Sequence, residues 1–179
     1  MHRLRLFSFL WLLLPFCSSA QVKNEEVVYW TEGSRLTWND YKGQADRATD
    51  AAASTATYLG IDYTFSPEGL AYTITCSFSK NRSWGLHKTD YILSHEQGHF
   101  DISEIFARKL HMKMSNYTLN RKTYKTDLKK IYDDTVQEKE DMQDAYDRET
   151  NHSIYKDKQA KWLKKIRLLL KEYEAYAGY

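Results

Sequence analysis

The chain changes character near residue 88, and this change constrains its fold more than any other feature. Residues 21–86 carry short segments rich in β-branched and aromatic side chains, which favour strands. Residues 89–177 carry apolar residues at helical spacing between charged faces. A block of strands followed by a block of helices is typical of α+β domains. The sequence therefore predicts an α+β fold in which an N-terminal antiparallel β-sheet is followed by three long helices.

The expected elements follow from these patterns. We expect strands at 27–30, 36–38, 55–59, 61–65 and 71–78, and a turn at 66–69. The small, polar segment 43–53 is expected to be a surface loop. We expect helices from about 89 to the break at 115–117, from 121 to 148, and from 154 to 176. The second helix is acidic in its latter half and the third is basic, which suits antiparallel neighbours with solvated charged faces.

Residues 1–20 have the organisation of a secretory signal peptide. Arg3 and Arg5 precede an apolar run at 6–16, and small residues at 18–20 follow it. This run is shorter than the stretch of about 20 residues that a membrane span needs, and nothing later in the chain approaches that length. We therefore expect a mature protein of residues 21–179 without a membrane span.

Cys17 allows an alternative, a lipoprotein signal, although the bulky Phe16 precedes it where such signals prefer small residues. Cys76 is the only cysteine after residue 20, so no internal disulfide is possible, and its apolar surroundings suggest a core position. A secreted chain without disulfides fits a bacterial protein that is secreted or periplasmic. Residues 21–179 have the length of one domain and carry 24 basic and 24 acidic residues, a balance that does not indicate nucleic-acid binding.

Residues 95–99 read His-Glu-Gln-Gly-His, the pattern H-E-x-x-H, in the first turns of the first expected helix. Residues four apart project from one face of a helix, so His95 and His99 can present ring nitrogens to one Zn²⁺ ion. Two imidazole ligands with an adjacent glutamate, here Glu96, as general base form the zinc-protease arrangement. The alternative is a polar helix face that carries two surface histidines. The capping residue Thr89 and the apolar pattern after residue 99 favour the metal site.

Gly98 costs about 1 kcal/mol relative to alanine inside a helix. A chain tolerates that cost more readily where another group approaches closely. We expect that group to be a neighbouring strand or a substrate.

A catalytic zinc site needs a third protein ligand and an open position. No third histidine follows His99 at the metzincin spacing, so we expect a more distant residue. An antiparallel second helix would come level with the two histidines at residues 137–141. His152, just past the end of that helix, is the first candidate. The alternatives are Asp147, Glu149, Glu138 and Asp141.

Three motifs resemble those of a known bacterial family, the secreted domain of unknown function 922. Its opening motif resembles Leu36-Thr37-Trp38-Asn39-Asp40-Tyr41-Lys42-Gly43, and its metal-helix motif resembles residues 93–102 with Ala107-Arg108. Its closing motif resembles residues 146–152 with Gln159 and Trp162, but the family usually has glycine where this chain has Ser153. The family is regarded as predicted zinc-dependent proteases, so the resemblance implies a zincin-like metallopeptidase.

These observations lead to one main hypothesis and two alternatives. The main hypothesis is a secreted zinc metallopeptidase that acts on a peptide or protein substrate, with ligands His95, His99 and His152 and with Glu96 as general base. Tyr146 or Tyr155 is a candidate for stabilising the oxyanion, and an edge strand of the sheet is a candidate for aligning the substrate backbone. The alternatives are a non-catalytic envelope protein that retains a metal site and a zinc amidase that acts on cell-wall material.

Overall fold

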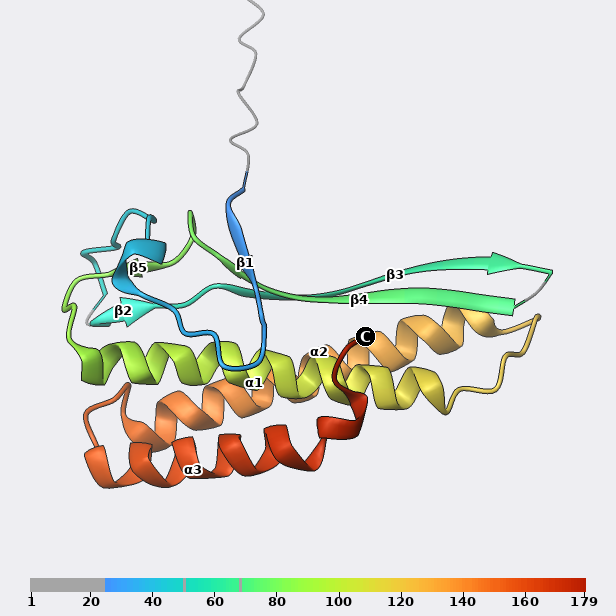
Figure 1. The fold of residues 1–179 in the computed structure, drawn as a ribbon. Coiled ribbons are helices and arrows are strands. Elements are labelled where there is room, and N and C mark those ends of the chain that lie inside the picture. The colour runs from blue at the N-terminus through green and yellow to red at the C-terminus, as the bar shows by residue number, and fades with distance from the viewer. Residues whose placement is uncertain (1–24, 50, 68) are drawn as a thin grey trace, which may run out of the picture.

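The computed structural model describes residues 25–49, 51–67 and 69–179. The expected signal peptide and Cys17 lie outside these residues. A long β-hairpin lies on one side of a central helix, and two further helices lie on the other side (Figure 1). This arrangement of an antiparallel sheet followed by three helices confirms the α+β prediction.

The hairpin consists of β3 (Thr57–Ser66) and β4 (Gly69–Ser79), which pair antiparallel from Thr57 opposite Phe78 to Ser66 opposite Gly69. Two strands were expected at 55–59 and 61–65, but they form the single strand β3. Gly60 between them pairs with Thr75 without interrupting the ladder. The predicted turn lies between the two strands of the hairpin.

β1 (Val27–Tyr29) adds to the other edge of β4, so the sheet order is β1-β4-β3. A separate pair of short strands, β2 (Ala53–Ser54) and β5 (Trp84–Gly85), lies over the first turns of the central helix (Figure 1). This second pair was not predicted, because strands of two residues show no periodicity.

The strand expected at 36–38 is wrong. Trp38–Asp40 forms a 3₁₀ helix, η1. The carboxylate of Asp40 accepts hydrogen bonds from the backbone N–H of Thr37 at 2.9 Å and from its hydroxyl at 2.8 Å. Local side-chain bonds of this kind compete with strand pairing and outweigh the strand preference of Thr37 and Trp38.

The central helix α1 (Asp90–Ser115) is covered on several sides, since the sheet, α2 (Tyr124–Thr150) and α3 (Lys156–Glu172) all pack against it. Thr89 caps it as predicted, because its side chain accepts a hydrogen bond from the N–H of Ile92 at 3.2 Å. The predicted apolar positions of this helix are all buried: Phe100, Ile102, Ile105, Phe106 and Leu110. The polar residues of its H-E-x-x-H motif are therefore held in the interior.

α2 and α3 pack against each other, and the short 3₁₀ helix η2 (Glu174–Tyr176) follows α3. No ion pair between α2 and α3 occurs among the described residues. Their charged faces are solvated, and the buried ring of Trp162 on α3 contacts the ring of Tyr146 on α2. Cys76 is a buried free thiol in the core, as expected. None of the described helices is both long enough and apolar enough to cross a bilayer.

Candidate metal centre

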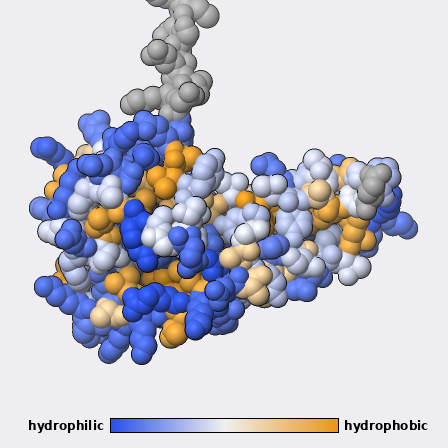
Figure 2. Space-filling view, in the orientation of Figure 1, coloured by the Kyte–Doolittle hydropathy of each residue, from blue (hydrophilic) through white to orange (hydrophobic). Residues whose placement is uncertain are grey.

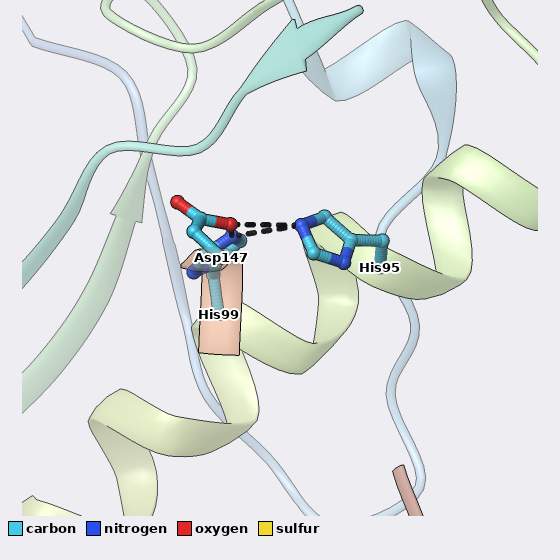
Figure 3. A group of neighbouring side chains, drawn as sticks. All are labelled: His95, His99 and Asp147. Atoms are coloured by element: carbon cyan, nitrogen blue, oxygen red, sulfur yellow. Dashed lines mark hydrogen bonds and ion pairs between the residues drawn. The ribbon is translucent and has the colours of Figure 1, made fainter. Parts of the chain in front are cut away.

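Three side chains from two helices converge on one point. The Nε2 atoms of His95 and His99 on α1 each lie 3.0 Å from Oδ1 of Asp147 on α2, and they lie 3.2 Å from each other. Figure 3 shows both imidazole rings directed at the same carboxylate. Within the described part of the chain, these residues form the one group of histidine, cysteine and carboxylate side chains with metal-site geometry.

The distances fit a tetrahedral zinc ion. Atoms bound to one zinc at about 2.0–2.1 Å in tetrahedral geometry lie about 3.3 Å apart. The three atom pairs here are 3.0 to 3.2 Å apart, so a small outward movement of the side chains accommodates the ion. The donor set of two imidazoles and one carboxylate is also one of the sets found in catalytic zinc sites.

Gln143 orients His99. Its Oε1 lies 2.5 Å from Nδ1 of His99, and its Nε2 donates to the backbone carbonyl of His99 at 3.0 Å. Because a glutamine oxygen only accepts, Nδ1 of His99 must carry the hydrogen. Nε2 of neutral His99 then has a free lone pair directed at the centre, which is the tautomer that a metal ligand needs.

His95 is held by packing. Its ring stacks on the ring of Tyr146, with centroids 4.4 Å apart and planes 27° apart. Nδ1 of His95 is buried and has no hydrogen-bond partner among the described residues. Tyr146 is fully buried and donates its hydroxyl to the backbone carbonyl of His95 at 3.3 Å. The hydroxyl of Tyr146 is therefore engaged under the helix, while Tyr155 is half-exposed at the start of α3.

The close approach expected at Gly98 involves Tyr146 and not a strand or a substrate. A Cβ atom added to Gly98 would lie 2.6 Å from the Tyr146 hydroxyl and 2.9 Å from two ring carbons. Glycine at this position lets α2 approach α1 closely enough for Asp147 to reach both histidines.

We therefore expect Gly98→Ala to lower the free energy of unfolding by about 1–3 kcal/mol through overpacking. The control is Gly60→Ala, because the nearest atom to a Cβ there is 3.9 Å away. Urea unfolding of the two variants measures the difference. Equal stability of Gly98→Ala and the wild type would contradict the tight contact.

Glu96 is buried beside the two histidines, and its partners come from the strand-rich half of the chain. Its Oε2 accepts a hydrogen bond from the hydroxyl of Thr55 at 2.7 Å. Thr55 lies between β2 and β3, and its Oγ1 is 2.8 Å from the hydroxyl of Tyr41. The carboxylate therefore has a fixed place next to the three converging side chains.

The other predicted ligands lie elsewhere. His152 is 63% exposed, and its Nδ1 lies 3.6 Å from Oδ2 of Asp147, whereas the two histidines contact Oδ1. Glu149 accepts from the indole of Trp162, Glu138 pairs with Lys113, and Asp141 accepts from Gln137. Of the alternatives to His152, Asp147 is the residue that the structure brings to His95 and His99.

The expected register of the second helix was wrong by more than one turn. Residues 143–147 are level with the histidines, whereas 137–141 had been expected. The connection between α1 and α2 spans 116–123, so α2 begins later than the break in sequence suggested. This longer connection moves every residue of α2 along the axis of α1.

The turn after α2 has an unusual backbone. Asn151, His152 and Ser153 all have positive φ, of 48°, 48° and 73°. Ser153 therefore adopts a conformation that glycine adopts without strain and that other residues rarely adopt. The hydroxyl of Tyr91 donates to the carbonyl of Ser153 at 2.7 Å and ties this turn to α1.

The three converging side chains and Glu96 open onto a cleft of about 670 Å³. The segment 51–58 lines one side, α2 lines the other between Lys139 and Asp147, and His152 lies at one end. The wide part of the molecule carries the β2–β5 pair and the first turns of α1, and its surface is mainly hydrophilic with apolar patches (Figures 1 and 2). The cleft is large enough for several residues of a peptide.

The protonation states of His95, His99 and Asp147 depend on one another. Burial lowers the pKa of His95 below its ordinary value. Burial also acts to lower the pKa of His99, but the hydrogen bond and charge of Asp147 outweigh it and raise that pKa to about 9. Burial acts to raise the pKa of the Asp147 carboxyl, and the two imidazoles hold it well below its usual range. Without metal, His99 and Asp147 therefore form an ion pair.

This ion pair gives the metal-free protein a pH-dependent stability. A folded-state pKa of about 9 for His99, above the ordinary 6.5, adds stability that is complete below pH 6.5 and lost as the pH rises to 9. Urea unfolding with chelator present at pH 6, 7.5 and 9 measures this loss. In Asp147→Asn the loss should disappear, because the charge that raises the pKa is gone. A stability that rises over this pH range would contradict the ion pair.

Sequence reasoning missed Gln143, Thr55 and Tyr41. Gln143 lies one helical turn before Asp147, and that spacing was a usable signal once Asp147 was a candidate. Tyr41 lies inside the opening motif but gives no indication of its partner. Thr55 is one of many threonines in strand-like sequence, and no local pattern singles it out.

A family model described as "Bacterial protein of unknown function (DUF922)" matches residues 21–153 of the chain. The matched range includes α1 and α2 and ends at the turn after α2. Searches of curated proteins and of solved structures each found no match.

Proposed function

This chain belongs to the bacterial family of unknown function DUF922, and we propose that it is a zinc-dependent hydrolase that cleaves peptide bonds. The observation that carries the proposal is the convergence of His95, His99 and Asp147 within 3.2 Å, with the buried carboxylate of Glu96 beside them at the wall of a cleft. A site kept only for structure has no use for the added carboxylate. Structural zinc also favours four protein ligands.

In this proposal His95, His99 and Asp147 hold the ion. Zinc bound there would act as a Lewis acid that polarises the scissile carbonyl group and makes water more acidic. Gln143 keeps His99 in the tautomer that binds metal, and Tyr146 fixes the plane of the His95 ring. The protein thus supplies an ordered donor set and leaves the side facing the cleft open.

Glu96 takes the proton of the attacking water. The Thr55 hydroxyl bonds to Oε2 of Glu96, so Oε1 is the oxygen that accepts the proton. After the carbonyl carbon has been attacked, the same oxygen delivers the proton to the leaving amine.

An extended peptide is the substrate that the cleft supports best. The segment 51–58 lies along the cleft opposite α2, and β2 within it has a strand partner, β5, on one side only in the described part of the chain. Such an edge can pair with the backbone of an extended chain. The apolar run and small residues of 1–20 further support action outside the cytoplasm, in the periplasm or beyond.

The test is to purify residues 21–179, measure zinc by elemental analysis, and compare the digestion of casein and of peptidoglycan. We expect about one equivalent of zinc and cleavage of casein that chelator abolishes. Digestion of peptidoglycan alone would establish the cell-wall amidase instead. Less than about a tenth of an equivalent after zinc loading, or full zinc without hydrolysis of either material, would overturn the proposal.

A further inference from the structure

Glu96 on α1 is linked to two hydroxyl groups from separate segments of the first half of the chain. The hydroxyl of Thr55 is 2.7 Å from Oε2 of Glu96 and 2.8 Å from the hydroxyl of Tyr41. Tyr41 and Glu96 are buried, with exposed fractions of 5% and 4%. Few hydrogen bonds to solvent can therefore replace these contacts. The fold places Thr55 between Tyr41 and Glu96.

The direction of the two hydrogen bonds follows from the chemistry of the groups. An ionised carboxylate only accepts, so the single hydrogen of the Thr55 hydroxyl points to Glu96. The Oγ1 atom of Thr55 must then accept, and Tyr41 donates to it. Burial, together with the nearby charge of Glu96, raises the pKa of Tyr41 well above its ordinary value, so its hydroxyl keeps its hydrogen.

Tyr41 is itself held firmly. Its ring contacts Trp38 with centroids 4.9 Å apart and Phe78 with centroids 5.0 Å apart. Trp38 in turn packs on Gly85, where an added Cβ would lie 2.6 Å from the indole ring. The motif at 36–43 is therefore anchored to the sheet and to β5, and its tyrosine projects toward the base.

We propose that Tyr41 and Thr55 are positioning residues that hold the Glu96 carboxylate in the orientation required for proton transfer. This inference rests on the proposed hydrolase function. It assigns a role to the opening motif, which otherwise lies apart from the converging histidines and Asp147. Neither residue belongs to that cluster, and the hydrogen bonds connect them to it through Glu96.

The first experiment measures hydrolysis by the zinc-loaded protein. We expect Thr55→Val and Tyr41→Phe to lower kcat by about 10- to 100-fold with KM and zinc content unchanged, because a misplaced base slows proton transfer. Thr55→Ser keeps the hydroxyl and should restore most of the rate. The positioning role would be overturned if the variants lost zinc or if only KM changed. It would also be overturned if Thr55→Val and Thr55→Ser had equal kcat.

Matched controls separate positioning from general loss of stability. Thr135→Val removes a fully buried hydroxyl that accepts from Lys113, and Tyr132→Phe removes a hydroxyl that donates to the carbonyl of Leu59. Both residues lie on α2 outside the cleft. We expect these variants to lose stability to a similar degree and to retain the wild-type kcat. A matching fall in their kcat would overturn the inference.

A second readout does not require activity. Tyr41 reaches Glu96 through Thr55, so Tyr41→Phe and Glu96→Ala should show coupled effects on urea unfolding that vanish when Thr55 is valine. Absence of coupling would overturn the relay even in an active enzyme. A wild-type protein that binds zinc but hydrolyses nothing, with the coupling present, would instead reject the proposed function while leaving the contact chain established.

Discussion

Glu96→Gln should lower kcat for peptide hydrolysis by about 10²- to 10⁴-fold while zinc content stays at the wild-type level. Glutamine has the shape of glutamate but cannot take a proton at neutral pH. Its amide oxygen can still accept the hydrogen bond from Thr55, so the local structure should persist. The measurement is kcat on a cleaved peptide, together with zinc by elemental analysis.

Glu104→Gln is the matched control for this effect. Glu104 is a buried carboxylate on the same helix, but it bonds to Arg108 at 2.8 Å and to Tyr179 at 2.6 Å, away from the cleft. Its replacement should lower stability and leave kcat near the wild-type value. If Glu96→Gln cleaved the peptide at the wild-type rate, Glu96 would not be the base.

Much of the candidate site was predictable because its central part is local. The spacing of His95 and His99 fixes their common face as soon as a helix forms, and both the Thr89 cap and the apolar positions of that helix are confirmed. The strand and turn preferences likewise located the long hairpin. These predictions rest on contacts between residues close in sequence, so they do not depend on how distant segments pack together.

The parts that could not be predicted depend on contacts between segments. The length of the connection at 116–123 sets the register of α2, and that register decides which residue of α2 reaches the two histidines. The partner of Gly98 was likewise unknown until Tyr146 was placed beside it. The segment 36–38 was misassigned because the hydrogen bonds that Thr37 donates to the Asp40 side chain outweigh strand preference.

Zinc affinity distinguishes Asp147 from His152 as the third ligand, and we expect a large effect on it. Asp147→Ala should weaken zinc binding by more than about 100-fold, since removal of a supporting residue outside the ligand set already costs about 10- to 100-fold. Gln143→Ala, which removes the partner of His99, should fall in that smaller range. The measurement is the zinc dissociation constant from competition with a chelator of known affinity.

His152→Ala is the decisive comparison. The imidazole of His152 is exposed, and its Nδ1 lies 3.6 Å from Oδ2 of Asp147, whereas the two histidines contact Oδ1. To be the third ligand, this side chain would have to take the place of Asp147, and the turn that carries it is tied to α1 by Tyr91. We therefore expect His152→Ala to change zinc affinity much less than Gln143→Ala does. The reverse order would make His152 the third ligand, and it would mean that zinc binding rearranges the left-handed turn at 151–153.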